Sequence, residues 1–201
     1  MRKLILASTS KYRGELLARL GLPFEAVAPG VDEAPLPGEA PEARAARLAA
    51  AKARSVRAAD AVVIGSDQVA SLDGALLRKP GGQAAALRQL TASQGRVVLF
   101  HTAVTVLDPA NGAEWSHVDR TEVRFARLPA AALERYLELE QPFDCAGSFK
   151  SEGLGVALFE RVETGDPTAL IGLPLIWLAA TLRSAGLDPL GPAPRAPTGR
   201  P

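Results

Sequence analysis

The chain has 201 residues, of which 47% are hydrophobic and 22% are charged, a composition that predicts a globular protein with a substantial core. The formal net charge of +1 excludes a strong overall attraction to nucleic acid, so any anion-binding site has to be local. A single cysteine, Cys145, excludes an intramolecular disulfide and suits a reducing compartment. The apolar stretches are too short for a signal peptide or a membrane span, so we expect a cytoplasmic location and no membrane partner.

The first segment predicts a strand followed by a capped helix. An apolar run over residues 4–7 leads into hydroxyl residues, and leucines at helical spacing follow before Gly21. Ser8 or Ser10 suits the N-cap position. Because a helix N-terminus offers free N–H donors and partial positive charge, this turn with Arg13 suits a phosphate group. The alternative is an ordinary capped helix without a ligand, and this stretch alone favours neither interpretation.

The next elements are a strand over residues 24–28, a loop with Glu33, and a helix over residues 41–58. Proline suits the first turn of this helix, and apolar residues at three- and four-residue spacing form its inward face. Lys52 lies on that face. A lysine there usually extends its amine to the solvent edge. We favour a buried anion site at the amine, because the helix has many solvent-facing positions for a lysine.

Residues 61–64 form a β-branched run without alternation, which predicts a central strand covered on both faces. We expect Asp67 to lie beyond the carboxyl end of this strand, where ligands gather in open α/β sheets. An acid in that place is often only a turn former or a helix cap. No helix pattern follows, however, and residues 69–77 predict a small hairpin that leads to Lys79. This context favours a functional role for Asp67.

The rest of the chain alternates helices and strands. The patterns predict a helix over 83–93, strands over 97–107 and 114–126 that form a long antiparallel hairpin, a helix over 129–140, a strand over 156–162 and a helix over 174–185. His101 and His117 show no metal-ligand spacing and are interpreted as structural. We expect one α/β domain over residues 1–190, with a mixed β-sheet flanked by helices, and a disordered tail over 191–201.

Several short motifs occur in order along the chain. They are Leu-Ala-Ser-Thr-Ser at 6–10, Val-Asp-Glu at 31–33, Gly-Ser-Asp-Gln at 65–68, Lys-Pro at 79–80, Cys-Ala-Gly-Ser-Phe-Lys-Ser-Glu-Gly at 145–153, Asp-Pro at 166–167 and Ile-Gly-Leu-Pro-Leu at 171–175. With Arg13 and Lys52, this set resembles the Maf family of nucleoside triphosphate pyrophosphatases. The resemblance covers the chain from Lys3 to about Leu190.

Within that family the chain is most similar to the branch that hydrolyses 7-methyl-GTP. The branch acting on dTTP and UTP typically has Ser-Pro-Arg-Arg in the first turn, Asp-Thr after the central strand and a glutamine in the late loop. This chain has Tyr12, Gln68 and Glu152 at those places. It also departs from the family: Tyr12 stands where the branch typically has tryptophan, Lys11 replaces a proline, and Gly14 replaces a second arginine. The last change removes one guanidinium fork for phosphate, which Lys11 would replace in part.

The resemblance implies a Maf/ITPase-like fold, a divalent cation (Mg²⁺ or Mn²⁺), a small-molecule nucleotide substrate and frequent homodimers. The implied reaction hydrolyses the α–β phosphoanhydride, giving a nucleoside monophosphate and pyrophosphate. The implied site consists of catalytic Asp67, Arg13, Lys52 and Lys79, substrate-binding Ser8, Ser10, Tyr12, Gln68 and Glu152, and the metal ligands Glu33 and Asp67. Asp67 is also our candidate base for the attacking water.

Base recognition has a physical rationale as well. Methylation at N7 makes guanine cationic, so the face of Tyr12 attracts it. The carboxylate of Glu152 can accept two N–H groups of guanine, and Gln68 would either contact the base or hold Glu152.

Two alternatives stay open. One is the same reaction on dTTP, UTP or other modified nucleotides, a house-cleaning role. The other is a non-catalytic regulator of septum formation, the effect that gave the family its name. A nucleic-acid binder is disfavoured, because the basic residues show no aromatic-interleaved pattern.

Overall fold

The structure, a computed structural model, describes residues 2–191 of the chain. Apart from Gly191, the tail expected to be disordered lies outside the described residues. The described residues form a mixed sheet in the order β2-β1-β3-β5-β6-β7. The short strand β4 pairs with β3 along the same side as β1. The strands are β1 (Lys3–Ala7), β2 (Glu25–Ala26), β3 (Ala61–Leu72), β4 (Ala75–Leu77), β5 (Val97–Asp108), β6 (Ala113–Phe125) and β7 (Phe159–Glu163).

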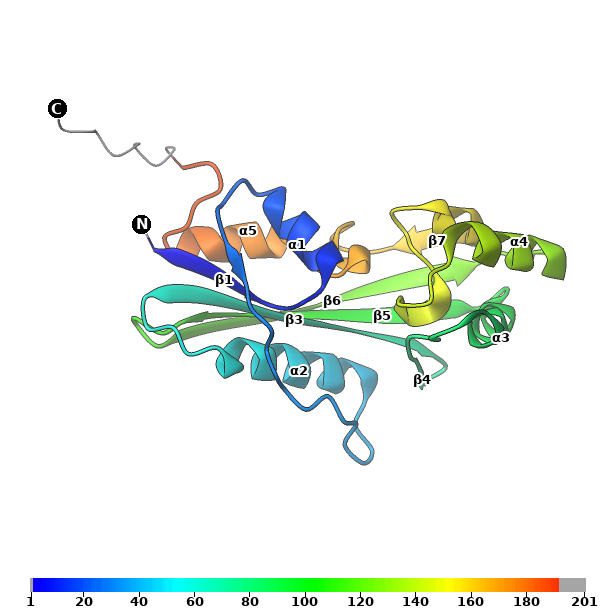
Figure 1. The fold of residues 1–201 in the computed structure, drawn as a ribbon, viewed down its shortest axis with the longest axis horizontal. Helices are drawn as coiled ribbons and strands as arrows, with labels where there is room; N and C mark the ends of the chain where they lie inside the picture. The colour runs from blue at the N-terminus through cyan, green and yellow to red at the C-terminus, as the bar shows by residue number, and fades with distance from the viewer. Residues whose placement is uncertain (1, 192–201) are drawn as a thin grey trace.

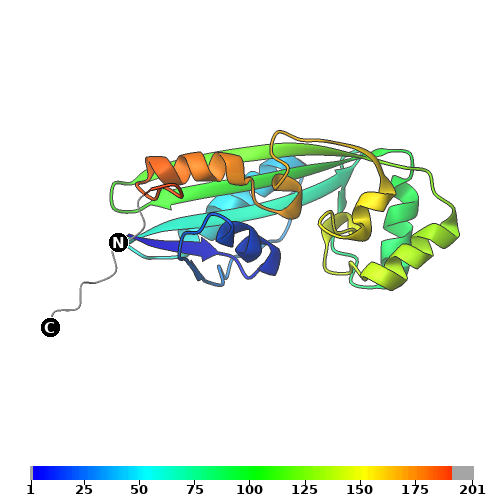
Figure 2. The same ribbon diagram turned by 90° about the horizontal axis from the view of Figure 1, so that it is seen from above.

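Helices cover both faces of this sheet (Figure 1). One face carries α2, and the opposite face carries α1 and α5, while α3 and α4 gather at the far end beside β7 (Figures 1 and 2). The helices are α1 (Lys11–Ala18), α2 (Pro41–Ser55), α3 (Gln83–Ser93), α4 (Ala130–Glu140) and α5 (Leu175–Ser184), with short 3-10 turns η1 (Ala146–Ser148), η2 (Leu154–Leu158) and η3 (Ala169–Ile171). The expected mixed α/β architecture is confirmed. No helix within residues 2–191 combines the length and apolar character that crossing a membrane requires.

The central strand was predicted too short. β3 continues from the apolar run through Asp67 to Leu72, because β5 pairs with it antiparallel along nearly its whole length. Asp67 therefore lies inside the strand and not beyond its end. Gly65 has a packing role: a Cβ there would lie 2.3 Å from the carbonyl oxygen of Ala49 in α2. The missing side chain lets α2 lie directly against β3.

β5 and β6 pair antiparallel from Val97 with Arg124 to Asp108 with Ala113, joined by a short turn. The last strand starts later than predicted, because η2 occupies the beginning of the expected range.

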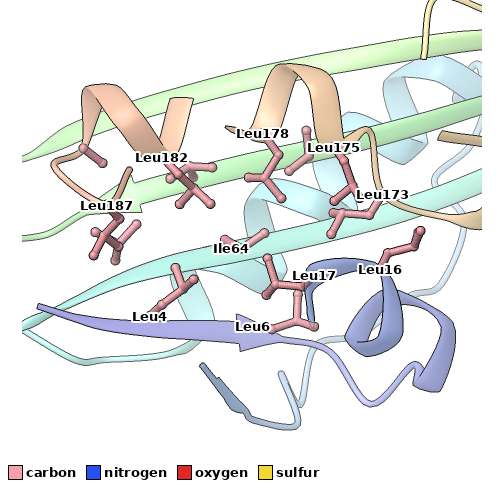
Figure 3. Packing of buried hydrophobic residues seen from close by; sticks show 14 residues of the cluster. Leu4, Leu6, Leu16, Leu17, Ile64, Leu173, Leu175, Leu178, Leu182 and Leu187 are labelled. Atoms are coloured by element: carbon pink, nitrogen blue, oxygen red, sulfur yellow. The ribbon is translucent and has the colours of Figure 1, made fainter. Parts of the chain in front are cut away.

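Two apolar clusters lie along the face of the sheet opposite α2. Figure 3 shows the first, in which leucines of β1, α1 and α5 pack around Ile64. The second gathers around Phe100 and Phe125 under α3 and α4. Because side chains alternate between the faces of a strand, Ser66, Gln68 and Thr102 fall on this same face between the clusters. A polar band therefore separates the two halves of the core.

Candidate active site

The site lies at a gap along one side of β3. β1 pairs with this side up to Gly65, and β4 pairs with it from Ala70 onward. Within the described sheet, residues 66–69 have no neighbouring strand on that side. Because β1 runs parallel and β4 antiparallel to β3, the carboxyl ends of both strands point into the gap. The chain leaving β1 carries the first turn of α1, and the chain leaving β4 carries Lys79.

A cleft of about 790 Å³ opens at this gap. All ten residues that the sequence placed in the site line it: Ser8, Ser10, Tyr12, Arg13, Glu33, Lys52, Asp67, Gln68, Lys79 and Glu152. They come from the turn before α1 and its first residues, from the last turn of α2, from β3, and from the loops that follow β2, β4 and η1. A volume of this size falls within the usual range for small-molecule sites.

A buried ion pair lies at the centre of the cleft. The Lys52 side chain is only 7% exposed, and its Nζ atom lies 2.6 Å from Glu33 Oε1 and 2.7 Å from Asp67 Oδ1. Desolvation raises the pKa of Glu33, but the bond to Lys52, with help from Arg13 and Lys79, outweighs it and leaves that pKa below its ordinary value. The amine of Lys52 is thus buried among carboxylates and does not extend to the solvent edge.

Arg13 is held at the start of α1. Ser10 is the N-cap of this helix, and its Oγ accepts the backbone N–H of Arg13 at 3.4 Å. Ser8 Oγ accepts the N–H of Ser10 at 3.1 Å and lies 3.5 Å from Arg13 Nη1. Burial lowers the pKa of the Arg13 guanidinium, while the charges of Asp67 and Glu33 oppose that shift. This turn therefore brings hydroxyl groups and a guanidinium together at the carboxylate pair.

Tyr12 and Glu152 mark another part of the cleft. The Cys145 thiol donates to the Tyr12 hydroxyl at 3.9 Å. Burial raises the pKa of Tyr12, and Cys145, Asp144 and Glu152 add to the shift through their charges. Glu152 is exposed, on a turn anchored where Glu140 Oε2 accepts the Leu154 N–H at 2.7 Å. An aromatic ring and a carboxylate are thereby available in one region.

Gln68 has a structural task. Its Nε2 atom lies 3.0 Å from Thr102 Oγ1 and from the carbonyl oxygens of Ala169 and Leu170. The amide group is thereby committed to η3 and not to Glu152. Of the two roles considered from the sequence, support of Glu152 is not the one observed.

The donor set fits a divalent cation that also binds substrate. Glu33 and Asp67 offer hard carboxylate oxygens, and Mg²⁺ is commonly bound by one or two carboxylates together with substrate phosphates and waters. Residues 2–191 contain no group of three or more His, Cys, Asp or Glu side chains arranged to enclose a metal. A cation here would therefore need ligands from the substrate or from water.

Further cations also line the cleft: Arg44, Arg78 and Lys150, which had no role assigned from the sequence, and Lys11, considered there only as a partial replacement for a missing arginine. Arg44 Nη2 donates to the backbone oxygen of Glu33, and Lys150 Nζ donates to the backbone oxygen of Glu140 at 3.1 Å. Lys11 also lines the cleft, and its side chain is 84% exposed. Arg44 could have been predicted from the sequence, because it precedes Lys52 by two four-residue steps and therefore lies on the same face of the helix.

The chain is similar to known proteins over most of its length. The family model described as "Maf-like protein" matches residues 3–185. A relative from Xanthomonas oryzae pv. oryzae (strain MAFF 311018), named "7-methyl-GTP pyrophosphatase", is 57% identical over 188 residues, covering 92% of this chain and 98% of that protein. A relative of the same name from Burkholderia pseudomallei (strain K96243) is 54% identical over 200 residues, covering 96% and 93%.

Among solved structures, the chain is similar to a HAM1 protein from Coxiella burnetii. The TM-score is 0.51 at 15% identity, covering 92% of this chain and 100% of that one. This likeness is one of fold.

Proposed function

We propose that this chain, which belongs to the Maf family, hydrolyses the α–β phosphoanhydride bond of 7-methyl-GTP and releases 7-methyl-GMP and pyrophosphate. The observation that carries the proposal is the convergence of Arg13, Lys52 and Lys79, from three separate segments, on one cleft that also holds Asp67 and Glu33. Relatives with more than half of their residues identical carry the matching name.

The cations of the cleft would bind the triphosphate. Phosphoryl transfer requires mainly positioning and countercharge on the phosphate oxygens. Arg13, Lys52 and Lys79 supply the charge, and the N-terminus of α1 adds backbone N–H donors beside Ser8 and Ser10.

Glu33 and Asp67 would hold Mg²⁺ or Mn²⁺, which supplies further countercharge when bound. Asp67 would also accept the proton of the water that attacks the α-phosphorus. Lys52 keeps the Asp67 carboxylate in place through the 2.7 Å contact with Oδ1. The second oxygen of this carboxylate is the proposed acceptor of the proton.

Tyr12 and Glu152 would recognise the base. The cationic ring of 7-methylguanine gains attraction from an aromatic face, which ordinary guanine lacks. The exposed Glu152 carboxylate can accept N–H groups from the Watson–Crick edge. Gln68 enters the proposal as part of the wall against which the substrate lies.

The proposed setting is the cytoplasm, with a small-molecule nucleotide as the partner and a homodimer as the assembly. The free thiol of Cys145 supports the reducing compartment. The assembly rests only on the resemblance to the family.

The test measures pyrophosphate release from 7-methyl-GTP, GTP, UTP and dTTP, each with and without Mg²⁺ or Mn²⁺. We expect the highest kcat/KM with 7-methyl-GTP and loss of turnover after chelation. Equal rates with all four nucleotides would overturn the substrate, and no pyrophosphate from any of them would favour the non-catalytic alternative.

A further inference from the structure

The chain between β7 and α5 crosses the sheet face at the polar band that separates the two apolar clusters (Figure 2). We call residues 164–172 the crossing segment. It contains the Asp-Pro motif and the beginning of the Ile-Gly-Leu-Pro motif, to which the proposed reaction gives no task. Its last residue, Gly172, lies at the cleft.

Side chains of the sheet hold the backbone of the crossing segment. Thr102 Oγ1 donates to the carbonyl oxygen of Ala169 at 2.9 Å, beside the bonds from Gln68. At the other end of the segment, Thr121 Oγ1 lies 2.9 Å from Thr164 Oγ1. Thr102 and Thr121 are fully buried. Polar groups are costly to bury in a sheet face that apolar residues could fill, so their presence points to a need for a fixed position.

Asp166 and Thr168 fold the segment upon itself. Asp166 is 3% exposed, and its Oδ1 accepts the backbone N–H and the hydroxyl of Thr168 at 2.9 and 2.6 Å. Its Oδ2 accepts the N–H of Ile176 at 2.6 Å, in the first turn of α5. Thr168 Oγ1 also accepts the N–H of Leu175 at 2.9 Å. These bonds fix how the segment enters α5, and with it the direction of the Gly172 carbonyl.

The Gly172 carbonyl links the crossing segment to Arg13 in the cleft. Its oxygen accepts one hydrogen bond from Arg13 Nε at 3.0 Å and another from the hydroxyl of Ser66 at 3.2 Å. Ser66 is fully buried. Gly172 has a φ of +131°, a conformation that residues with a side chain rarely adopt. A guanidinium has five N–H donors in a fixed plane, so binding Nε sets the direction of the others.

We infer that the crossing segment is a positioning element for Arg13, built from Asp166 and Thr168 and bound to the sheet through Ser66, Gln68 and Thr102. The inference rests on the proposed function, because it assigns Arg13 to the phosphates. The segment itself touches no reacting atom in this scheme. It presents the guanidinium in one orientation.

A double-mutant cycle tests this. Thr168→Val removes the hydroxyl at nearly constant volume, and we expect kcat/KM to fall about tenfold, a coupling of ordinary size for residues in one hydrogen-bond network. In an Arg13→Lys background, where the Nε donor is already absent, the same change should alter kcat/KM by less than about twofold. Thr168→Ser restores the hydroxyl and should restore activity. Additive losses in the two backgrounds would overturn the inference.

Controls separate positioning from folding. Thr181→Val, a buried threonine of α5 away from the crossing segment, should leave kcat/KM unchanged. If Thr168→Val does not fold, Ser66→Ala takes its place in the cycle. The cycle is repeated with the Kd of inorganic pyrophosphate, which needs no turnover. Coupling in Kd with no turnover of any nucleotide would reject the proposed function and keep the inference.

Discussion

Lys52 Nζ lies 2.7 Å from Asp67 Oδ1, so α2 and β3 meet at the centre of the cleft through a buried ion pair. The contact depends on the close approach of helix to strand at Gly65. Gly65, which the packing of α2 requires, and Asp67, the proposed catalytic carboxylate, therefore lie only two positions apart in β3.

Asp67→Asn should lower kcat by about 100-fold or more while the protein stays folded. The amide can still accept a hydrogen bond from Lys52, but it is a poor proton acceptor. Steady-state kinetics and circular dichroism check the two parts of this prediction. Near-normal turnover in the folded variant would remove Asp67 from the mechanism.

Lys52→Met should destabilise the protein and abolish activity. Removing the ammonium leaves Glu33 and Asp67 without their shared countercharge, and breaking a buried pair costs about 3–5 kcal/mol. Thermal and urea unfolding measure this loss. Lys3→Met breaks the exposed pair with Asp60 and should scarcely change Tm. Similar Tm values for both variants would show that burial gives the central pair no special weight.

Gly65→Ala should destabilise the protein by about 1–3 kcal/mol or more, because the new methyl group would lie 2.3 Å from a backbone oxygen of α2. The shift of α2 should also raise KM, since Lys52 moves with the helix. Urea denaturation provides the free energy of unfolding. Gly14→Ala is the matched control: nothing lies within 4 Å of the added Cβ, and helix propensity predicts a gain of about 0.5–1 kcal/mol.

Tyr12→Ala should reduce kcat/KM for 7-methyl-GTP by about 5- to 30-fold, the range expected for a partly desolvated cation–π contact. The loss with GTP should be smaller, because its base carries no charge. Tyr12→Trp should raise the preference for the methylated nucleotide. Equal losses with both nucleotides after Tyr12→Ala would show that the ring does not distinguish the cationic base from the neutral one.

Cys145 should react slowly with iodoacetamide at neutral pH. Burial, followed by the charge of Asp144, raises the pKa of its thiol to about 12 from an ordinary value of 9.0. The thiolate fraction at pH 7 is then roughly a thousandfold below that of an unperturbed thiol. Because the pKa is raised, the alkylation rate should keep climbing about tenfold per pH unit from pH 8 to 11. A plateau near pH 9 in mass-spectrometric time courses of the folded protein would contradict this.

Local patterns in the sequence predicted only part of the site, and the remaining site residues were assigned through the resemblance to the Maf family. Lys52 on an apolar stripe and Ser10 before the first helix are both legible from spacing. The length of β3 could not be predicted, because it depends on pairing with β5, which lies about 30 positions later in the chain. The contact of Arg13 with Gly172 spans 159 positions, and no local pattern encodes a backbone carbonyl as the partner of an arginine. The hydrogen bonds of Gln68 to η3 were missed for the same reason, since these partners are backbone oxygens about 100 positions away.

The gap along β3 also constrains how such a cleft can change its size. Residues 66–69 separate the last pairing of β1, at Gly65, from the first pairing of β4, at Ala70, a span of about 17 Å at the usual rise per residue. Deleting Ser66 would shift the following residues by one position and turn Asp67 to the face away from Lys52. Lengthening or trimming the ends of β1 and β4 would change the opening without that inversion. Changes in the lengths of β1 and β4 can therefore adapt the cleft to larger or smaller ligands while the length of β3 stays constant.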